Sequence, residues 1–200
     1  MVRRLVVVCH CTLALAAGAA FAQHGPVVTG PPLLTNPPPE ARQLDFLVGQ
    51  WELVALPKVS TLVAVFHGQP KLVGTWKAWR ALDGFGIDEE LRLTDETGNP
   101  LLLSRSLRIF DRARRRWSGS TLDVYRARFS DSTGESKGGQ VTFTTSGTDA
   151  EGKRYVMRGR FYDVKPNAFR WQQDRSYDGG KTWDETLKIE ARRVAAAAPR

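Results

Sequence analysis

Short runs of alternating apolar and polar residues, rich in Val, Thr, Trp, Tyr and Phe, follow one another from residue 46 onward. Gly, Asp and Asn separate the runs at regular intervals. This alternation is typical of strands in a sandwich or a closed antiparallel barrel. It predicts nine or ten strands, near 49–56, 61–67, 72–82, 86–94, 101–110, 115–129 (with a bend at Gly119 or Asp123), 138–146, 154–163, 168–176 and 182–193.

The residues before the strands have the pattern of an export signal. Arg3 and Arg4 precede an apolar run at 5–20, and Ala20-Phe-Ala22 predicts cleavage before residue 23. The expected organisation is a signal peptide at 1–22, a spacer rich in Pro and Gly at 23–39, a barrel domain at 40–194 that opens with a short helix, and a disordered tail at 195–200.

Cysteine content and charge narrow the function classes. Cys9 and Cys11 both lie in the signal, so the cleaved chain is expected to hold no disulfide and no thiolate metal site. No later segment is apolar enough to predict a membrane span. The formal net charge is +8, and in an exported protein such a charge favours small anionic ligands or anionic surfaces over nucleic acid. The dense cluster Arg112–Arg116 is predicted to be an exposed hairpin turn.

The segment S-Y-D-G-G-K-T-W, Ser176–Trp183, matches the Asp-box pattern that recurs on the blades of sialidase propellers. It occurs once, and no repeat of blade length accompanies it, so a propeller is not expected. The local interpretation is a hairpin in which Asp178 accepts backbone N–H groups, Gly179 and Gly180 adopt positive φ, and Trp183 packs over the loop.

The segment L-D-F-L-V-G-Q-W at 44–51 resembles the F-D-F-x-x-G-x-W opening of a family of bacterial secreted domains of unknown function. Further similar motifs are Gly74-Thr-Trp76, Phe110-Asp111 with Trp117, Arg158-Gly-Arg-Phe161 and Phe169-Arg-Trp171, and the likeness spans about residues 44–193.

This resemblance implies an all-β, antiparallel calycin-like or lipocalin-like barrel that contains a binding cavity. A short N-terminal helix would close one end of the barrel, and Trp51 would lie across that end. The family has no known activity. In the related nitrobindin-like barrels a histidine late in the chain binds haem, whereas this chain has no histidine after His67. We therefore expect no haem, no other cofactor and no metal site.

Strand alternation supplies the candidate site. Residues two apart share one face of a strand, and several charged or amide residues alternate with large apolar ones. If the apolar faces line the barrel, the inward polar residues are Glu89, Arg105, Gln173, Arg175 and Glu185. The aromatic walls of the cavity would be Trp51, Trp76 and Trp171. No catalytic residue is assigned.

Two interpretations of these inward charges remain open. Glu89 or Glu185 could pair with Arg105 or Arg175 and fill a narrow barrel, or the arginines could hold a ligand carboxylate or phosphate. The favoured function is a periplasmic or secreted, non-catalytic binding protein for a small amphipathic ligand, which an anionic group would suit. The alternatives are a plugged-barrel structural or interaction module of the cell envelope, or a hydrolase or isomerase that uses the inward carboxylates. The oligomeric state is left open.

Overall fold

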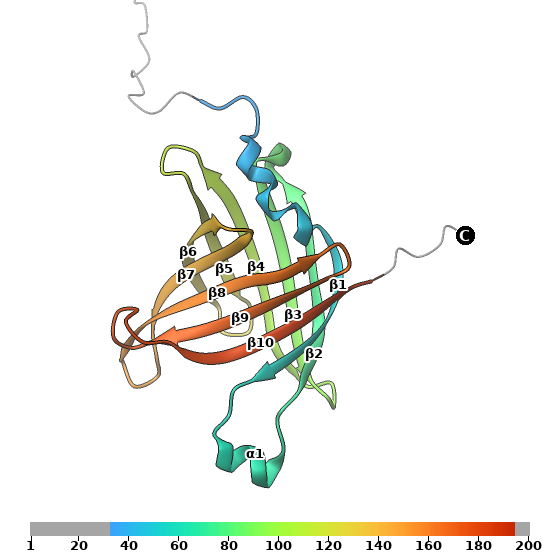
Figure 1. Cartoon of the computed structure of the whole chain (residues 1–200), viewed down its shortest axis with the longest axis vertical. Helices are drawn as coiled ribbons and strands as arrows, with labels where there is room; N and C mark the ends of the chain where they lie inside the picture. Colours follow the sequence, from blue (N-terminus) through green and yellow to red (C-terminus); the bar gives the residue numbers. More distant parts are fainter. Residues whose placement is uncertain (1–32, 195–200) are drawn as a thin grey trace, which may run out of the picture. The chain divides into compact units, whose positions relative to one another are not determined.

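The computed structural model of the protein describes residues 33–194, and these residues form a closed barrel of ten antiparallel strands. Each strand pairs with its neighbours in sequence, and the first pairs with the last (Figure 1). The strands are β1 (Gly49–Pro57), β2 (Leu72–Ala81), β3 (Gly86–Asp95), β4 (Pro100–Asp111), β5 (Arg116–Asp123), β6 (Arg128–Lys137), β7 (Gln140–Thr148), β8 (Arg154–Lys165), β9 (Ala168–Ser176) and β10 (Asp184–Arg193). The prediction of an antiparallel barrel with a short N-terminal helix is confirmed.

That helix, η1 (Pro39–Leu47), is a 3-10 helix that packs against one end of the barrel. Its Leu44 and Leu47 are fully buried, and the Leu47 carbonyl accepts a 2.8 Å hydrogen bond from the indole of Trp51. Trp51 is itself fully buried. The helix therefore supplies both the apolar residues and the acceptor that seat this tryptophan.

Arg193, at the end of β10, ties the first and last strands together at the same end. Its guanidinium donates to the carbonyls of Val48 at 2.7 Å and Phe46 at 3.0 Å, and its Cζ lies 4.0 Å from the ring centre of Trp51. Gly49 has a φ of 131°, and a Cβ there would collide with this guanidinium. Only glycine fits at this position, because it provides both the backbone conformation and the space.

Two predicted strands are wrong in the structure. Residues 61–67 form a short helix, α1 (Thr61–His67), that joins β1 to β2. This segment is apolar without the alternation of a half-buried strand, and such short runs do not distinguish helix from strand. The segment 115–129, predicted as one strand with a bend at Gly119 or Asp123, is two strands, β5 and β6, and the break follows Asp123, which accepts the backbone N–H of Arg126 at 3.2 Å in a turn.

A further helical element, η2 (Leu82–Gly84), joins β2 to β3. None of the helices in residues 33–194 is long and apolar enough to cross a membrane. The predicted signal peptide, the first part of the spacer, both cysteines and the predicted tail at 195–200 lie outside the described residues.

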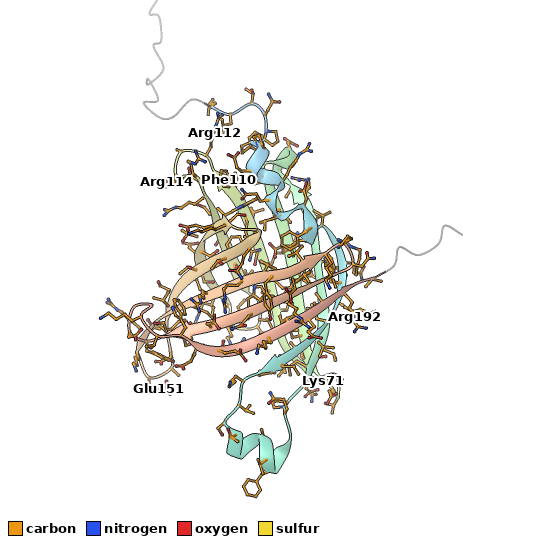
Figure 2. The ribbon with its side chains drawn as sticks, in the orientation of Figure 1. Lys71, Phe110, Arg112, Arg114, Glu151 and Arg192 are labelled. Carbon is orange, nitrogen blue, oxygen red and sulfur yellow. The ribbon has the colours of Figure 1, made fainter. Side chains whose placement is uncertain are left out.

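Two loops singled out in the sequence connect strands. The arginine cluster forms the β4–β5 turn, where Arg112 and Arg114 are exposed as predicted (Figure 2). In the β9–β10 loop, Asp178 accepts the backbone N–H groups of Lys181 at 3.0 Å and Thr182 at 2.9 Å. Gly179 and Gly180 have φ of 75° and 93°. The Trp183 indole donates to the Gly180 carbonyl at 2.9 Å.

Candidate functional site: a two-part cavity in the barrel

The barrel encloses a cavity of about 320 Å³, here called the inner cavity. One side of it, the apolar wall, consists of Trp76, Leu91, Leu102, Phe143, Met157, Trp171 and Leu187. The other side, the hydroxyl wall, consists of Ser104, Ser106, Thr121, Ser130 and Ser132. Polar and apolar surfaces thus face each other across the same small space.

The hydroxyl wall follows from the register of three neighbouring strands. Ser106 on β4 lies opposite Thr121 on β5, and Thr121 lies opposite Ser130 on β6. The hydroxyl oxygens of Ser106 and Thr121 are 2.8 Å apart and share a hydrogen bond. Each hydroxyl combines one donor with two acceptor lone pairs, so the pair retains capacity for further hydrogen bonds into the cavity.

Two glycines leave the space that two aromatic rings of the apolar wall occupy. A Cβ on Gly159 of β8 would lie 2.7 Å from the Trp171 ring, and a Cβ on Gly134 of β6 would collide with the Phe143 ring. The rings of Trp76 and Trp171 meet edge to face, with centroids 6.2 Å apart. The flat aromatic surface therefore depends on strand positions that carry no side chain.

A buried ion pair between Glu89 on β3 and Arg108 on β4 also lines the inner cavity. Glu89 is 2% exposed, and its Oε2 accepts a 3.0 Å hydrogen bond from the Trp76 indole. The Cζ of Arg108 lies 4.4 Å from the centre of the Phe143 ring. Burial lowers the pKa of Arg108 to about 10, so the arginine stays charged at neutral pH and the pair adds no net charge to the cavity.

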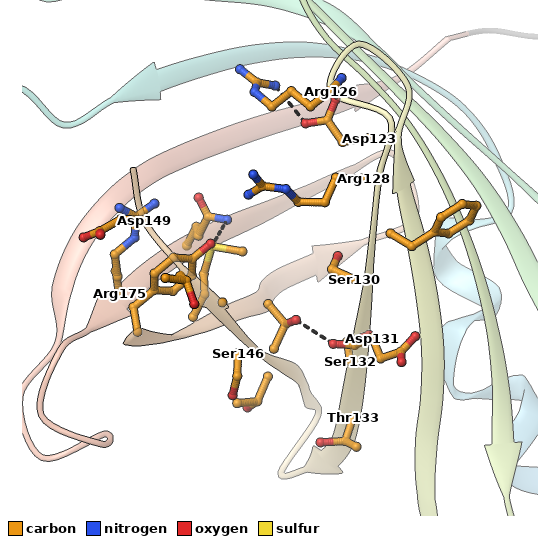
Figure 3. Close-up of a pocket in the computed structure, with 18 residues that line it drawn as sticks. Asp123, Arg126, Arg128, Ser130, Asp131, Ser132, Thr133, Ser146, Asp149 and Arg175 are labelled. Atoms are coloured by element: carbon orange, nitrogen blue, oxygen red, sulfur yellow. Dashed lines mark hydrogen bonds and ion pairs between the residues drawn. The ribbon is translucent and has the colours of Figure 1, made fainter. Parts of the chain in front are cut away.

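A wider hollow of about 1240 Å³, here called the vestibule, adjoins the inner cavity (Figure 3). The two spaces share lining residues from β6 and from β8 and β9, among them Ser130, Ser132, Met157 and Gln173. Arg128 and Arg175 line the vestibule but not the inner cavity. The inner cavity is therefore reached from solvent through a mouth that carries arginines.

Gln173 is held at the boundary between the two spaces. Its side-chain amide lies 2.6 Å from the sulfur of Met157, and its Oε1 accepts a 3.1 Å hydrogen bond from the Thr186 hydroxyl. These contacts fix the amide between the apolar wall and the mouth.

The structure brings five of the eight predicted site residues to this cavity. Glu89, Trp76, Trp171 and Gln173 line the inner cavity, and Gln173 and Arg175 line the vestibule. Trp51 lies across the closed end, as the resemblance implied, but it is not part of the cavity wall. The aromatic part of the prediction therefore holds for two of the three tryptophans.

The prediction that Arg105 points into the barrel is wrong. Its side chain lies on the outer surface, where Nε and Nη2 donate to Asp88 at 2.9 and 2.8 Å and Cζ lies 4.7 Å from the Trp79 ring. The inward face of β4 is the even-numbered one, which carries Ser104, Ser106 and Arg108, and Arg105 lies on the opposite face. Residues two apart share a face of a strand, so Leu101, Leu107 and Ile109 point outward together with Arg105.

The inward orientation predicted for Glu185 is wrong because of a β-bulge in its own strand pairing. A register shift lies between Glu185 and Leu187 in the β9–β10 pairing, so Leu187 faces the cavity while Glu185 forms a 2.8 Å ion pair with Lys188. Lys188 lies on the outer surface, next to the inward Ile189. Glu89 and Glu185 consequently lie on opposite sides of the barrel wall and do not form an acid–base pair.

Sequence reasoning missed the actual partner of Glu89 and the whole hydroxyl wall. Ser104, Ser106 and Arg108 occupy the even positions of β4, between leucines that are more apolar but face solvent. One signal could have found them, because Glu89 needs an inward cation and Arg108 is the arginine of β4 that faces the same side.

Within residues 33–194, no group of three or more His, Cys, Asp or Glu side chains is arranged to hold a metal ion.

Comparisons with known proteins yield structural likenesses only. No protein family profile matches the chain, and no curated protein matches it. The S-type phycobiliprotein lyase CPES from Guillardia theta is 11% identical, with a TM-score of 0.48 over 76% of this chain and 91% of the lyase. Rv2717c from M. tuberculosis is 10% identical, with a TM-score of 0.47 over 80% of this chain and 100% of that one. EF1p2_mFAP2b bound to DFHBI is 13% identical, with a TM-score of 0.39 over 77% and 98%. No ligand or activity is inferred from these likenesses.

Proposed function

We propose that this protein is a non-catalytic binding protein that holds one small amphipathic molecule inside its barrel. The observation that carries the proposal is the inner cavity, in which an apolar wall faces a hydroxyl wall. Its volume of about 320 Å³ lies at the lower end of the range for small-molecule pockets, which is several hundred cubic ångströms. The interior is open, which disfavours the plugged-barrel alternative.

The state of Glu89 favours binding over catalysis. Its two carboxylate oxygens are engaged by Arg108 and by the Trp76 indole. A general base must reach a substrate proton, and both oxygens of Glu89 are already occupied by groups of the protein. The second predicted carboxylate, Glu185, is on the outer surface.

Export to the periplasm or the medium is part of the proposal, and its support is the sequence pattern of residues 1–22. The intact mass of the purified protein measures this directly. A mass that corresponds to a chain beginning at Gln23 is expected, and a full-length mass would contradict it.

Binding of the neutral dye N-phenylnaphthylamine, followed by its fluorescence, tests the cavity. Two variants carry the same substitution on opposite sides of the wall. Ser104→Trp fills the hydroxyl wall, and Ser120→Trp places the indole on the outer surface of β5. We expect Ser104→Trp to weaken dye binding at least tenfold and Ser120→Trp to leave it unchanged, with circular dichroism to verify that both variants fold.

Two results would contradict the proposal. One is the absence of dye binding to the folded wild-type protein. The other is binding that survives Ser104→Trp but is lost in Ser120→Trp, because the dye would then occupy the outer leucine-rich face of β4 rather than the cavity.

A further inference from the structure

The charged residues at the mouth of the cavity differ in whether they already have partners. Arg126 is paired with Asp123 at 2.8 Å. Asp149 accepts the backbone N–H of Lys153 at 2.8 Å and so closes its own turn. By contrast, no carboxylate among residues 33–194 pairs with Arg128 or Arg175. The vestibule therefore presents two arginines without an ion-pair partner in this part of the chain, and its lining also includes the carboxylates of Asp131 and Asp149.

Arg175 is held in place without using all of its donors. Its Cζ lies 4.5 Å from the centre of the Tyr155 ring, and its Nη1 donates to the Tyr177 hydroxyl at 3.2 Å. Its Nε is buried and has no hydrogen-bond partner among the described residues. A buried donor that lacks a partner costs free energy, so the protein alone does not satisfy the Nε of Arg175.

Arg128 begins β6, on the other side of the vestibule from β9. Figure 3 shows its side chain extending from β6 over the hollow, on the side where Arg175 and Asp149 lie. Two cations that face one hollow repel each other, and an anion placed between them relieves this repulsion. A carboxylate or phosphate has enough oxygens to accept hydrogen bonds from both guanidinium groups.

The inner cavity offers no such site. Its arginine, Arg108, is neutralised by Glu89, and its remaining polar groups are neutral hydroxyls, together with the Gln173 amide and Asp123, which is paired with Arg126. Polarity therefore changes along the two-part cavity, from largely apolar inside to charged at the mouth, where Arg128 and Arg175 are the arginines without an ion-pair partner among the described residues.

We infer that Arg128 and Arg175 form the anion-binding part of the site, so that the ligand enters with its apolar end first and its carboxylate or phosphate remains at the mouth. This inference rests on the proposed function and specifies the class of ligand: a small molecule with an apolar body and one terminal anionic group.

Displacement of N-phenylnaphthylamine by three compounds of equal chain length tests the inference. Decanoate and decyl phosphate carry the two candidate head groups, and decanol carries none. We expect either anion to displace the dye at a concentration about tenfold below that needed for decanol. The anion with the lower concentration identifies the preferred head group, and either order supports the inference. Added salt should reduce the advantage of the anions and leave decanol unaffected.

Arginine variants then locate the anion. Arg128→Gln and Arg175→Gln should each weaken binding of the preferred anion about fivefold to tenfold and leave decanol unchanged. Arg105→Gln removes the same charge from the outer surface and is the matched control, with no change expected for any compound. If Arg175→Gln fails to fold, Arg128→Gln and the salt dependence of the wild type carry the test.

Equal binding of decanol and both anions, or an anion preference that neither Arg128→Gln nor salt reduces, would overturn the inference while leaving the proposed function in place. Failure of the dye and of all three compounds to bind would overturn the proposed function, and this inference with it.

Discussion

The two sides of the barrel interior differ in the residue types that their strands turn inward. On β9, the large apolar residues Phe169 and Trp171 face inward, and on β10 Ile189 does the same. On β4, the serines and Arg108 face inward, while Leu101 and Leu107 are 42% and 40% exposed on the outside. The same alternation of residue types thus has opposite orientations in two strands of one barrel.

The difference teaches that apolar alternation identifies the two faces of a strand but not which face is inside. Burial of the apolar face is the default because it removes apolar area from water. A closed barrel with a cavity departs from that default, since its interior need not be filled and polar residues can face a ligand. We expect a ligand to form its hydrogen bonds on the side of β4, where the alternation is reversed.

The largest contrast should appear when one residue of each side is truncated. Phe169→Ala removes a ring whose centroid lies 4.7 Å from that of Trp51 and 5.7 Å from that of Phe161. It should lower the free energy of unfolding by about 3 to 5 kcal/mol, because it opens a hole in a packed core. Ser106→Ala removes one hydrogen bond to Thr121 and should cost about 1 kcal/mol. Urea unfolding measures both.

Equal losses for the two variants would break the comparison. They would mean that the hydroxyl wall is packed as tightly as the aromatic core, which is incompatible with an open inner cavity.

The ion pair inside the barrel provides the next test. Glu89→Gln keeps the shape of the side chain and an acceptor for the Trp76 indole, but leaves Arg108 charged and buried without its partner. The free energy of unfolding should fall by about 3 kcal/mol. The double variant Glu89→Leu with Arg108→Met removes both charges and should recover most of that loss, since a buried pair repays little more than its own desolvation. A double variant as unstable as Glu89→Gln would contradict this account.

A third prediction sharpens the comparison with an ion cluster on the outer surface, and its effect should be the smallest. Asp174 on β9 accepts hydrogen bonds from Arg158 at 2.8 Å, Arg160 at 2.9 Å and Gln172 at 2.6 Å. Burial raises the pKa of Asp174, but these hydrogen bonds and the charges of Arg160 and Arg158 outweigh it and hold the net pKa below its ordinary value.

A carboxyl whose pKa is lower in the folded state binds fewer protons when folded than when unfolded. Its contribution to stability is therefore present above the unfolded pKa of about 3.9 and is lost as the pH falls through the folded pKa. Thermal melts from neutral pH to below pH 4 should show a smaller acid-induced drop for Asp174→Asn than for the wild type. Asp131→Asn, at an exposed position, is the control. Identical acid profiles for the wild type and Asp174→Asn would show that the cluster does not stabilise the fold.

The architecture could be predicted from the sequence because alternation and turn residues identify the strands of a barrel. Glu89, Trp76, Trp171, Gln173 and Arg175 were placed correctly because no register shift intervenes between them and the apolar residues beside them. Glu185 was misplaced because it lies beyond a β-bulge next to Thr186, and Arg105 was misplaced because the leucine-rich face of β4 points outward.

A bulge inserts a single residue and leaves no mark in composition, so alternation cannot reveal it. Arg108 and the serines of β4 were missed because the more apolar face of β4 was expected to point inward. What would have helped is pairwise reasoning across strands, since the buried Glu89 requires a cation on the neighbouring strand.

The hydrogen bonds that Arg193 donates to the segment before β1 bear on the order in which the barrel forms during synthesis. Its hydrogen bond to the Val48 carbonyl spans 145 positions of the chain, and β10 is the last strand to be synthesised. Until those residues have left the ribosome, β1 has no partner on one edge and the tryptophan at the closed end has no cation above it. Contacts this distant in sequence are slow to form, because a large loop must close before they contribute. The barrel thus completes its ring only with its final strand.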